Sequence, residues 1–477
     1  NAKYDVDIKS IVTNKKDLNQ LLGDSLLKAI NVPNNIALSG KVDGSMRNAA
    51  ARLNLQTSSG NAVIDATFKM QPGDTAYTAI VSTEALDLGY LLRNEKLLGP
   101  ITMKADVKGH NFSINNLAAD VKAEIESSMI NKYNYKNISI DATTEKNLYK
   151  AKIVSDDPNL KLKLDGIASF KTDSQYIVGL LDLQGANLQA LNLHDENVRV
   201  AGKLNAMIDG DLKALKGDAS ISDVMVIKGD DTYRVDSLAV VSVNDKKRSK
   251  LKMDNGVIMV DYDGTVQVPQ LISSLTHHIN QYFLINPAVD TITVDTATQD
   301  FTLAIKISPH PILDGVLLPG LKKFNGLELQ SKFDSKENIL ELDLDLPVIE
   351  YNTIGAEQVS FKLNTTEEAL EYKLLANTLT AGPVKLAETT FQGNAKDNVL
   401  DFALNIFDED SADKLIVAGD LREDEPKKFK LHLSEDKLTI SNTKWTLPSD
   451  NYIAFGAKGL MVNDIVLNNG GQSLSVQ

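Results

Sequence analysis

The chain has 477 residues, of which 43% are hydrophobic, and its 50 Lys and Arg against 64 Asp and Glu give a net charge of −14. This composition is typical of a folded globular protein and excludes disorder over most of the length. Nucleic-acid binding is not expected, because phosphate recognition needs clustered positive charge and the only dense basic run is Asp245-Lys246-Lys247-Arg248.

Cysteine is absent from the sequence, which excludes a thiol nucleophile, a disulfide framework and thiolate metal sites. This absence suits an oxidising compartment. The longest apolar stretches, such as 257–260, are far shorter than the ~20 residues that span a bilayer. The chain begins at Asn1 without Met and ends at Gln477 inside a strand-like alternation, so we interpret it as a piece of a longer protein.

The first predicted element is a helix at 17–29, in which leucines recur with helical spacing. A short helical turn fits 88–92. Strand-like alternation is clear further on, where three leucines alternate with lysines over 160–164. Alternation of this kind places every second side chain on one face of a strand and indicates a half-buried sheet.

A second helix is expected at 270–283, after Pro269, because Leu271, Leu275 and Ile279 follow helical spacing. The remaining elements are strands with one apolar and one charged face, separated by a turn at 365–370 and by short polar turns such as Pro72-Gly73-Asp74. The cleanest apolar sides, and the predicted lining of one continuous apolar surface, are Leu160, Leu162, Leu164, Phe301, Leu303, Ile305, Leu340, Leu342, Leu344, Leu400, Phe402, Leu404, Phe429, Leu431 and Leu433.

With a strand and a turn roughly every 12 to 16 residues, the chain would hold on the order of 30 strands. The few predicted helices cannot cover the apolar face of so many strands. We therefore predict an all-β fold over 1–477, an elongated and mostly antiparallel sheet curled into an open apolar trough. The helix at 270–283 would be a plug, a lid or a break in this trough.

Weak internal repetition supports a continuous architecture. The pattern Leu86-Asp87-Leu88, Gly99 and Gly109 recurs about a hundred residues later as Ala186-Asn187-Leu188, Gly202 and Gly210. Repeated blocks of strands that stack end to end favour one repeating domain over several unlike ones.

Two segments carry a resemblance to a known family. The first is 77–125, with Ala85-Leu86-Asp87-Leu88-Gly89-Tyr90-Leu91-Leu92 and Val107-Lys108-Gly109, and the second is Trp445-Thr446-Leu447-Pro448 with Gly470-Gly471-Gln472-Ser473-Leu474. These patterns resemble the TamB branch of the AsmA-like proteins, in its Bacteroidetes form. The similar pattern of apolar alternation extends over most of the chain, whereas the individual motifs have no invariant sequence signature.

The resemblance implies a periplasmic, taco-shaped sheet (a β-taco) whose hydrophobic groove carries phospholipid between the inner and outer membranes. It also implies an inner-membrane anchor and an outer-membrane barrel partner of the TamA type, both outside this fragment, and a role in outer-membrane biogenesis and protein secretion. Against the pattern of a full-length member, we expect this chain to be a fragment without the N-terminal anchor and the C-terminal barrel-docking part.

The sequence contains few candidate catalytic or metal-binding residues. Adjacent His277 and His278 would point about 100° apart on a helix, so we interpret them as solvated helix residues and not as metal ligands. No HExxH, Walker, GxSxG or dinucleotide motif occurs in the sequence. The sequence predicts a protein that is not an enzyme and that needs no cofactor or metal.

Alternating apolar residues more often form the closed core of a β-sandwich than a ligand-binding surface. A binding or adhesion module built from several sandwiches is therefore one alternative. A purely structural scaffold for outer-membrane protein assembly, with the same sheet and no lipid traffic, is the other. Repetition without enough helix to cover the sheet, together with the resemblance, favours the open trough.

Overall fold

The computed structural model describes residues 3–21, 30–111, 116–171, 174–209, 216–244, 248–284, 298–407, 413–425, 428–456 and 459–476. The chain divides into two compact units, Asn1–Leu238 (unit 1) and Ala239–Gln477 (unit 2). Strands dominate both units, and one antiparallel sheet contains strands from each. This confirms the all-β fold class and the antiparallel sheet.

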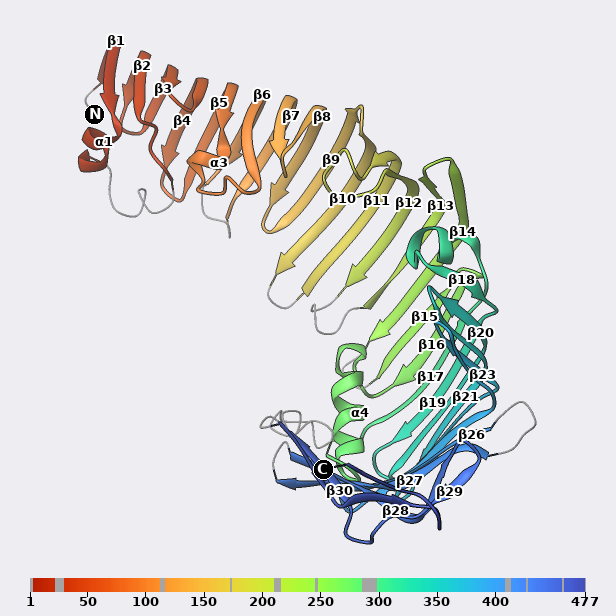
Figure 1. The fold of residues 1–477 in the computed structure, drawn as a ribbon. Helices are drawn as coiled ribbons and strands as arrows, with labels where there is room; N and C mark the ends of the chain where they lie inside the picture. The colour runs from red at the N-terminus through yellow and green to blue at the C-terminus, as the bar shows by residue number, and fades with distance from the viewer. Residues whose placement is uncertain are drawn as a thin grey trace. The chain divides into compact units, whose positions relative to one another are not determined.

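Unit 1 is a succession of long strands that lie side by side in chain order (Figure 1). The described strands are β1 (Lys3–Asn14), β2 (Asn35–Ser45), β3 (Asn48–Thr57), β4 (Gly60–Gln71), β5 (Asp74–Asp87), β6 (Leu98–His110), β7 (Ala118–Ile130), β8 (Tyr133–Glu145), β9 (Leu148–Asp157), β10 (Leu160–Lys171), β11 (Ser174–Asn187), β12 (Val198–Asp209), β13 (Lys216–Lys228) and β14 (Asp231–Asn244), the last of which continues into unit 2.

Two short helices accompany these strands. α1 is Lys15–Leu21, which covers only the start of the predicted helix, and 22–29 lie outside the described residues. α3 is Leu88–Leu91, at the predicted helical turn, and the Asp87 side chain caps it by accepting a hydrogen bond from Tyr90 N at 3.0 Å.

Unit 2 mixes long strands with shorter ones. Its strands are β15 (Ser249–Asp254), β16 (Ile258–Gly264), β17 (Asp300–Ile307), β18 (Leu321–Phe324), β19 (Leu327–Asp334), β20 (Ile339–Tyr351), β21 (Ile354–Thr365), β22 (Leu370–Ala376), β23 (Thr378–Ala381), β24 (Val384–Leu386), β25 (Thr389–Lys396), β26 (Val399–Phe407), β27 (Asp413–Glu425), β28 (Lys428–Ile440), β29 (Thr443–Trp445), β30 (Tyr452–Gly456), β31 (Gly459–Asn463), β32 (Ile465–Asn468) and β33 (Ser473–Val476).

The helical elements of unit 2 are η1 (Val268–Gln270), α4 (Leu271–Asn280) and the π-helical η3 (Leu313–Leu317). η1 and α4 together cover most of the helix predicted at 270–283. At 365–370 the described chain forms a turn and no helix, because the Thr366 hydroxyl accepts from the N–H groups of Glu368 and Ala369. Each helix in the described part of the chain falls short of what a bilayer-crossing helix requires in length and hydropathy.

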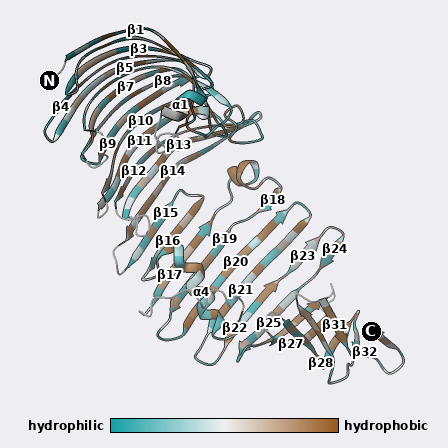
Figure 2. Ribbon diagram, turned by 90° about the vertical axis from the view of Figure 1, so that its left-hand side faces the viewer, coloured by the Kyte–Doolittle hydropathy of each residue, from teal (hydrophilic) through white to brown (hydrophobic). Residues whose placement is uncertain are grey.

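Most strands pair with the strands adjacent in sequence, and β32 and β33 form a separate hairpin. The several-sandwich alternative requires sheets packed face to face in pairs, whereas the described strands belong to one sheet and one hairpin. Figure 2 shows hydrophobic and hydrophilic residues alternating along the strands. In β20, for example, Glu341 and Asp343 are exposed while Leu340 is 2% exposed.

The sequence repeat in unit 1 has a structural counterpart. The Asn187 side chain accepts from Ala190 N at 3.1 Å, as Asp87 accepts from Tyr90 N at 3.0 Å in the earlier block. A register shift precedes each of these turns, at Thr83/Leu86 and at Leu183/Ala186. The two blocks therefore share a strand, a bulge and a capped turn.

Candidate functional site

Residues that lie directly opposite each other in an antiparallel ladder point to the same face of the sheet, and we call a series of such residues across many strands a row. The ladder pairs Phe301 with Phe333 and Leu344 with Phe361, and so continues from strand to strand across unit 2. By this register all twelve predicted lining residues of unit 2 lie on one face, which we call its apolar face.

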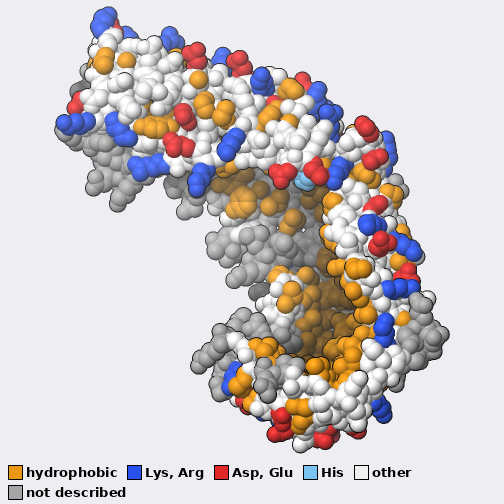
Figure 3. All heavy atoms as spheres, in the orientation of Figure 1, with side chains coloured by type: hydrophobic (Ala, Val, Ile, Leu, Met, Phe, Trp, Pro, Cys, Tyr) orange, Lys and Arg blue, Asp and Glu red, His pale blue; other side chains and the backbone are white. Residues whose placement is uncertain are grey.

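One row crosses this face without a polar member. The central row is Val240, Met253, Val260, Ile305, Leu329, Leu344, Phe361, Leu374, Phe391, Leu404, Val417 and Leu438. All of these side chains except Leu438 are half-buried, so each still offers apolar surface. Figure 3 shows hydrophobic side chains gathered over the face of unit 2 on which α4 lies.

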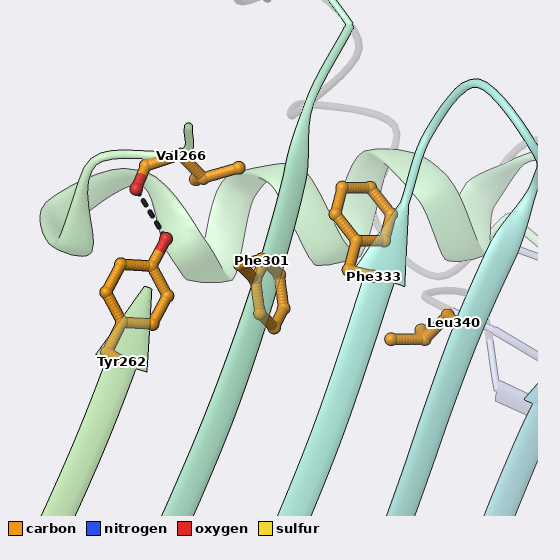
Figure 4. Close-up of a cluster of buried hydrophobic side chains, with 5 residues drawn as sticks. All are labelled: Tyr262, Val266, Phe301, Phe333 and Leu340. Atoms are coloured by element: carbon orange, nitrogen blue, oxygen red, sulfur yellow. Dashed lines mark hydrogen bonds between the residues drawn. The ribbon is translucent and has the colours of Figure 1, made fainter. Parts of the chain in front are cut away.

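A second row on this face, separated from the central row by the row of Leu303 and Leu342, is closed off by α4. This covered row consists of Phe301, Phe333, Leu340, Thr365, Leu370 and Ala395, and each member is at most 6% exposed. Leu271, Leu275 and Ile279 of α4 pack against the cluster that Tyr262, Val266, Phe301, Phe333 and Leu340 form (Figure 4). α4 thus supplies a second layer over one part of the apolar face.

The sequence-based view of His278 is wrong. Its side chain is 2% exposed and lies edge-on to the rings of Tyr282 and Phe333, with centroids at 5.5 and 5.1 Å. Its Nε2 lies 3.1 Å from Thr365 Oγ1, and this hydroxyl also accepts from Leu340 N and donates to Asn338 O. Burial lowers the pKa of His278 to about 4, so the imidazole is neutral at pH 7.

The opposite edge of the apolar face carries a second cover. Leu313 of η3 and Leu321 of β18 form a cluster with Val257, and Ile258 and Ile307 pack against it. Ile258 and Ile307 lie two residues along their strands from Val260 and Ile305 of the central row, on the same face. Over β16 and β17 the central row therefore runs between α4 on one side and η3 on the other.

The other face of unit 2 is polar and ion-paired. Lys362 Nζ lies 3.0 Å from Asp343 Oδ2, and Lys306 Nζ lies 2.6 Å from Glu328 Oε1. Lys250 and Arg248 both bond to Asp263 and hold its pKa below the ordinary value. Because water reaches this face and screens the charges, each ion pair contributes little stability.

Unit 1 repeats the division into two faces. Leu160, Leu162 and Leu164 lie on one face of β10, and Leu164 pairs with Ile153 and Leu181. The row through Leu164 is Leu53, Ile64, Val81, Ala105, Ala123, Ile140, Ile153, Leu164, Leu181, Leu204 and Ile221, which is apolar in every strand from β3 to β13.

The next row on the same face of unit 1 contains only small residues. It consists of Val42, Ala51, Ala66, Ala79, Val107, Val121, Ala142, Ala151, Gly166, Gly179, Ala206 and Ala219. On the polar face, exposed pairs such as Lys152–Asp165 at 3.5 Å and Arg52–Asp65 alternate in sign from strand to strand.

Sequence reasoning found the strands richest in leucine and missed other members of the rows. Only Ile305, Leu344 and Leu404 of the central row were predicted. Phe361, Leu374 and Phe391 are among the members that were missed, although apolar and polar residues also alternate in their strands. The small-residue row had no visible signal, because alanine and glycine between polar residues do not resemble an apolar stripe.

The arrangement offers hydrocarbon-like surface and few polar groups. Among the described residues no group of three or more His, Cys, Asp or Glu is placed to hold a metal ion. A ligand on these rows would gain free energy from burial of apolar surface and not from hydrogen bonds. In comparisons with known proteins, no protein-family model matches the chain and no curated protein matches it.

Proposed function

We propose that this chain carries the acyl chains of phospholipids along its apolar rows, as the periplasmic part of a bridge between the inner and outer membranes that supports outer-membrane biogenesis. In this proposal the sheet bends into an open trough whose inner surface is the apolar face. In this proposal the inner-membrane anchor, and the region that binds a separate barrel protein of the outer membrane, lie outside this sequence.

The central row is the observation that carries the proposal. Ten of its members, Met253 to Val417, are half-buried hydrophobic side chains that follow one another on successive strands. Soluble monomers rarely expose a continuous apolar patch of more than a few hundred Å² without a ligand or a partner. The resemblance to AsmA-like proteins supports the choice of lipid as that ligand.

The physical mechanism follows from the lack of polar groups on the row. Each methylene that leaves water gains about 0.8 kcal/mol, so a two-chain lipid does not cross water rapidly as a monomer. A row of similar apolar side chains removes this barrier. A lipid also has nearly the same energy at successive positions along the row, since no side chain of the row forms a hydrogen bond with an acyl chain. The lipid can therefore slide from strand to strand while its head group stays in water.

The test is lipid extraction and transfer with the purified chain. We expect phospholipid to copurify and to be identified by mass spectrometry, and we expect transfer from donor to acceptor vesicles of phosphatidylglycerol. Leu344→Asp should lower transfer at least tenfold, because a charge interrupts the central row. The matched control is Asp345→Asn, one residue along on the polar face, which should leave transfer unchanged.

A different result would support the scaffold or the closed-core alternative. If no lipid is bound and Leu344→Asp unfolds unit 2 by several kcal/mol, as expected for an unpaired charge in a closed core, the proposal is wrong.

A further inference from the structure

The direction in which α4 crosses the sheet determines what it can do to a ligand. Leu271 and Leu275, near its start, pack against the cluster that contains residues of β16, β17, β19 and β20. Tyr282 and Phe283, just after its end, pack with Leu370 and Ala395 of β22 and β25, and the Phe283 ring lies 6.5 Å from that of Phe429 in β28. The helical segment therefore runs across the strands, along the rows, and not along a strand.

A helix in this orientation does not close the central row. Its described packing partners belong to the covered row and to the row between it and the central row, which includes Leu303, Leu363 and Tyr372. Ile305, Leu344 and Leu374 of the central row remain half-buried. Exposed apolar surface thus continues beside the helix for the whole length of α4.

α4 is also held in place by polar contacts at its C-terminal end. Asn398, in the turn between β25 and β26, donates its N–H to Tyr282 O at 2.9 Å, and its Oδ1 accepts from Leu284 N at 2.9 Å. The Tyr282 hydroxyl donates to Thr366 O at 2.6 Å. Together with the buried His278–Thr365 contact, these bonds tie the helix to two separate turns of the sheet.

We propose that α4 is a fixed side wall of the lipid path in unit 2, which confines hydrocarbon chains to the central row, and that it is neither a plug nor a lid. This inference rests on the proposed function and adds to it which part of the apolar face takes the chains. We assign the acyl chain of a phospholipid as the ligand, because the central row is a narrow apolar strip whose side chains cannot form hydrogen bonds with a polar ligand. A head group would lie on the solvent side of the strip.

The first experiment maps the path by photo-crosslinking. A small alkyl-diazirine amino acid is placed at Leu344 or Leu374 in the central row, at Leu340 beneath α4, and at Asp345 on the polar face. The purified chain is then illuminated with phosphatidylglycerol vesicles that carry tritiated acyl chains. We expect capture at Leu344 and Leu374 to exceed capture at Leu340 and Asp345 at least tenfold. A parallel arm with free tritiated oleate distinguishes phospholipid from fatty acid, and stronger capture of oleate would overturn the choice of phospholipid.

The second experiment fixes the helix. Because the chain has no cysteine, Leu284→Cys with Asn398→Cys introduces one thiol pair at neighbouring positions, which a short bismaleimide can join. If α4 is a wall, joining the pair leaves capture at Leu344 within twofold of the unjoined variant.

Three results would overturn the inference. A tenfold loss at Leu344 after joining would identify α4 as a lid that must open. Capture at Leu340 equal to that at Leu344 would show that chains replace α4 on the covered row. If the central row captures nothing with the helix free or joined, the proposed function itself is wrong.

Discussion

Units 1 and 2 use the same antiparallel register for different packing. In unit 2 the apolar face carries Leu, Ile, Phe and Tyr, and α4 and η3 cover parts of it, so that clusters of buried side chains form. In unit 1 a row of Ala, Val and Gly runs beside a row of larger residues, and most members of both rows are only half-buried. A binary pattern therefore decides which face is apolar, whereas side-chain size and a covering helix decide how much of that face becomes core.

The largest difference between the units is expected in the loss of stability when one apolar side chain is truncated, because such side chains are covered in unit 2 and half-buried in unit 1. Phe301 is 1% exposed, so Phe301→Ala should lower the stability of unit 2 by about 3–5 kcal/mol. Leu164→Ala, at a half-buried position of unit 1, should cost about 1–2 kcal/mol. Hydrogen exchange followed by mass spectrometry measures the opening free energy of each unit separately. Equal losses would mean that cover by α4 does not make the apolar face of unit 2 more tightly packed than that of unit 1.

Acid should destabilise unit 2 through His278. Its pKa is about 4 in the folded chain and 6.5 when unfolded, so the unfolded state binds more protons between these values. The stabilising contribution is complete above pH 6.5 and falls by about 3 kcal/mol as the pH drops to 4. The comparison is between the wild type and His278→Gln in chemical denaturation at several pH values. If both lose stability in parallel over this range, the buried imidazole is not the cause.

A smaller effect is expected at a buried carboxylate in unit 1. Asp157 is 0% exposed and accepts from the Tyr133 hydroxyl at 2.6 Å and from the N–H groups of Lys136 and Asn159. Tyr133→Phe removes one of these donors and should cost about 1–2 kcal/mol. Tyr372→Phe in unit 2 is the matched control, since its hydroxyl contacts a solvent-accessible carbonyl and its removal should cost about 0.5 kcal/mol or less. A loss at Tyr372 as large as that at Tyr133 would mean that burial does not govern these hydroxyl bonds.

The smallest change should follow from the charged face. Lys152 Nζ lies 3.5 Å from Asp165 Oδ2, and both side chains are more than half exposed. Lys152→Ala should alter the stability of unit 1 by less than about 0.5 kcal/mol in urea denaturation. A loss above 1 kcal/mol would show that the alternating charges act as a cooperative network.

Much of the fold was predictable because alternation is a local property. The strands at 160–164, 301–307 and 340–346 and the helix near 270–283 follow directly from the spacing of their apolar residues. The rows were not predictable, because they depend on how far each strand is shifted against the next. Register shifts such as the one between Thr83 and Leu86 are set by turns and bulges whose geometry the pattern does not contain.

The site was predictable only in part for the same reason. Leu344 and Leu404 lie in strands whose alternation is clear in the sequence. Ala142 and Ala151 belong to the small-residue row only because the register places them opposite each other. His278 was interpreted as a solvated helix residue because adjacent His277 and His278 diverge by about 100° on a helix and cannot share one metal ion. Its burial depends on which side of α4 meets Phe333 and Thr365, a tertiary contact that spacing alone does not specify.

The pairing of neighbouring strands also governs how such a chain can change in length. β7 pairs with β8, β8 with β9 and β9 with β10, all antiparallel. Removal of the hairpin β8–β9 would bring β7 beside β10 in the correct direction and place Ala123 opposite Leu164. Removal of one strand alone would reverse the direction of all that follows. Insertions and deletions should therefore be tolerated in pairs of strands, so that a protein of this kind grows or shrinks by whole hairpins.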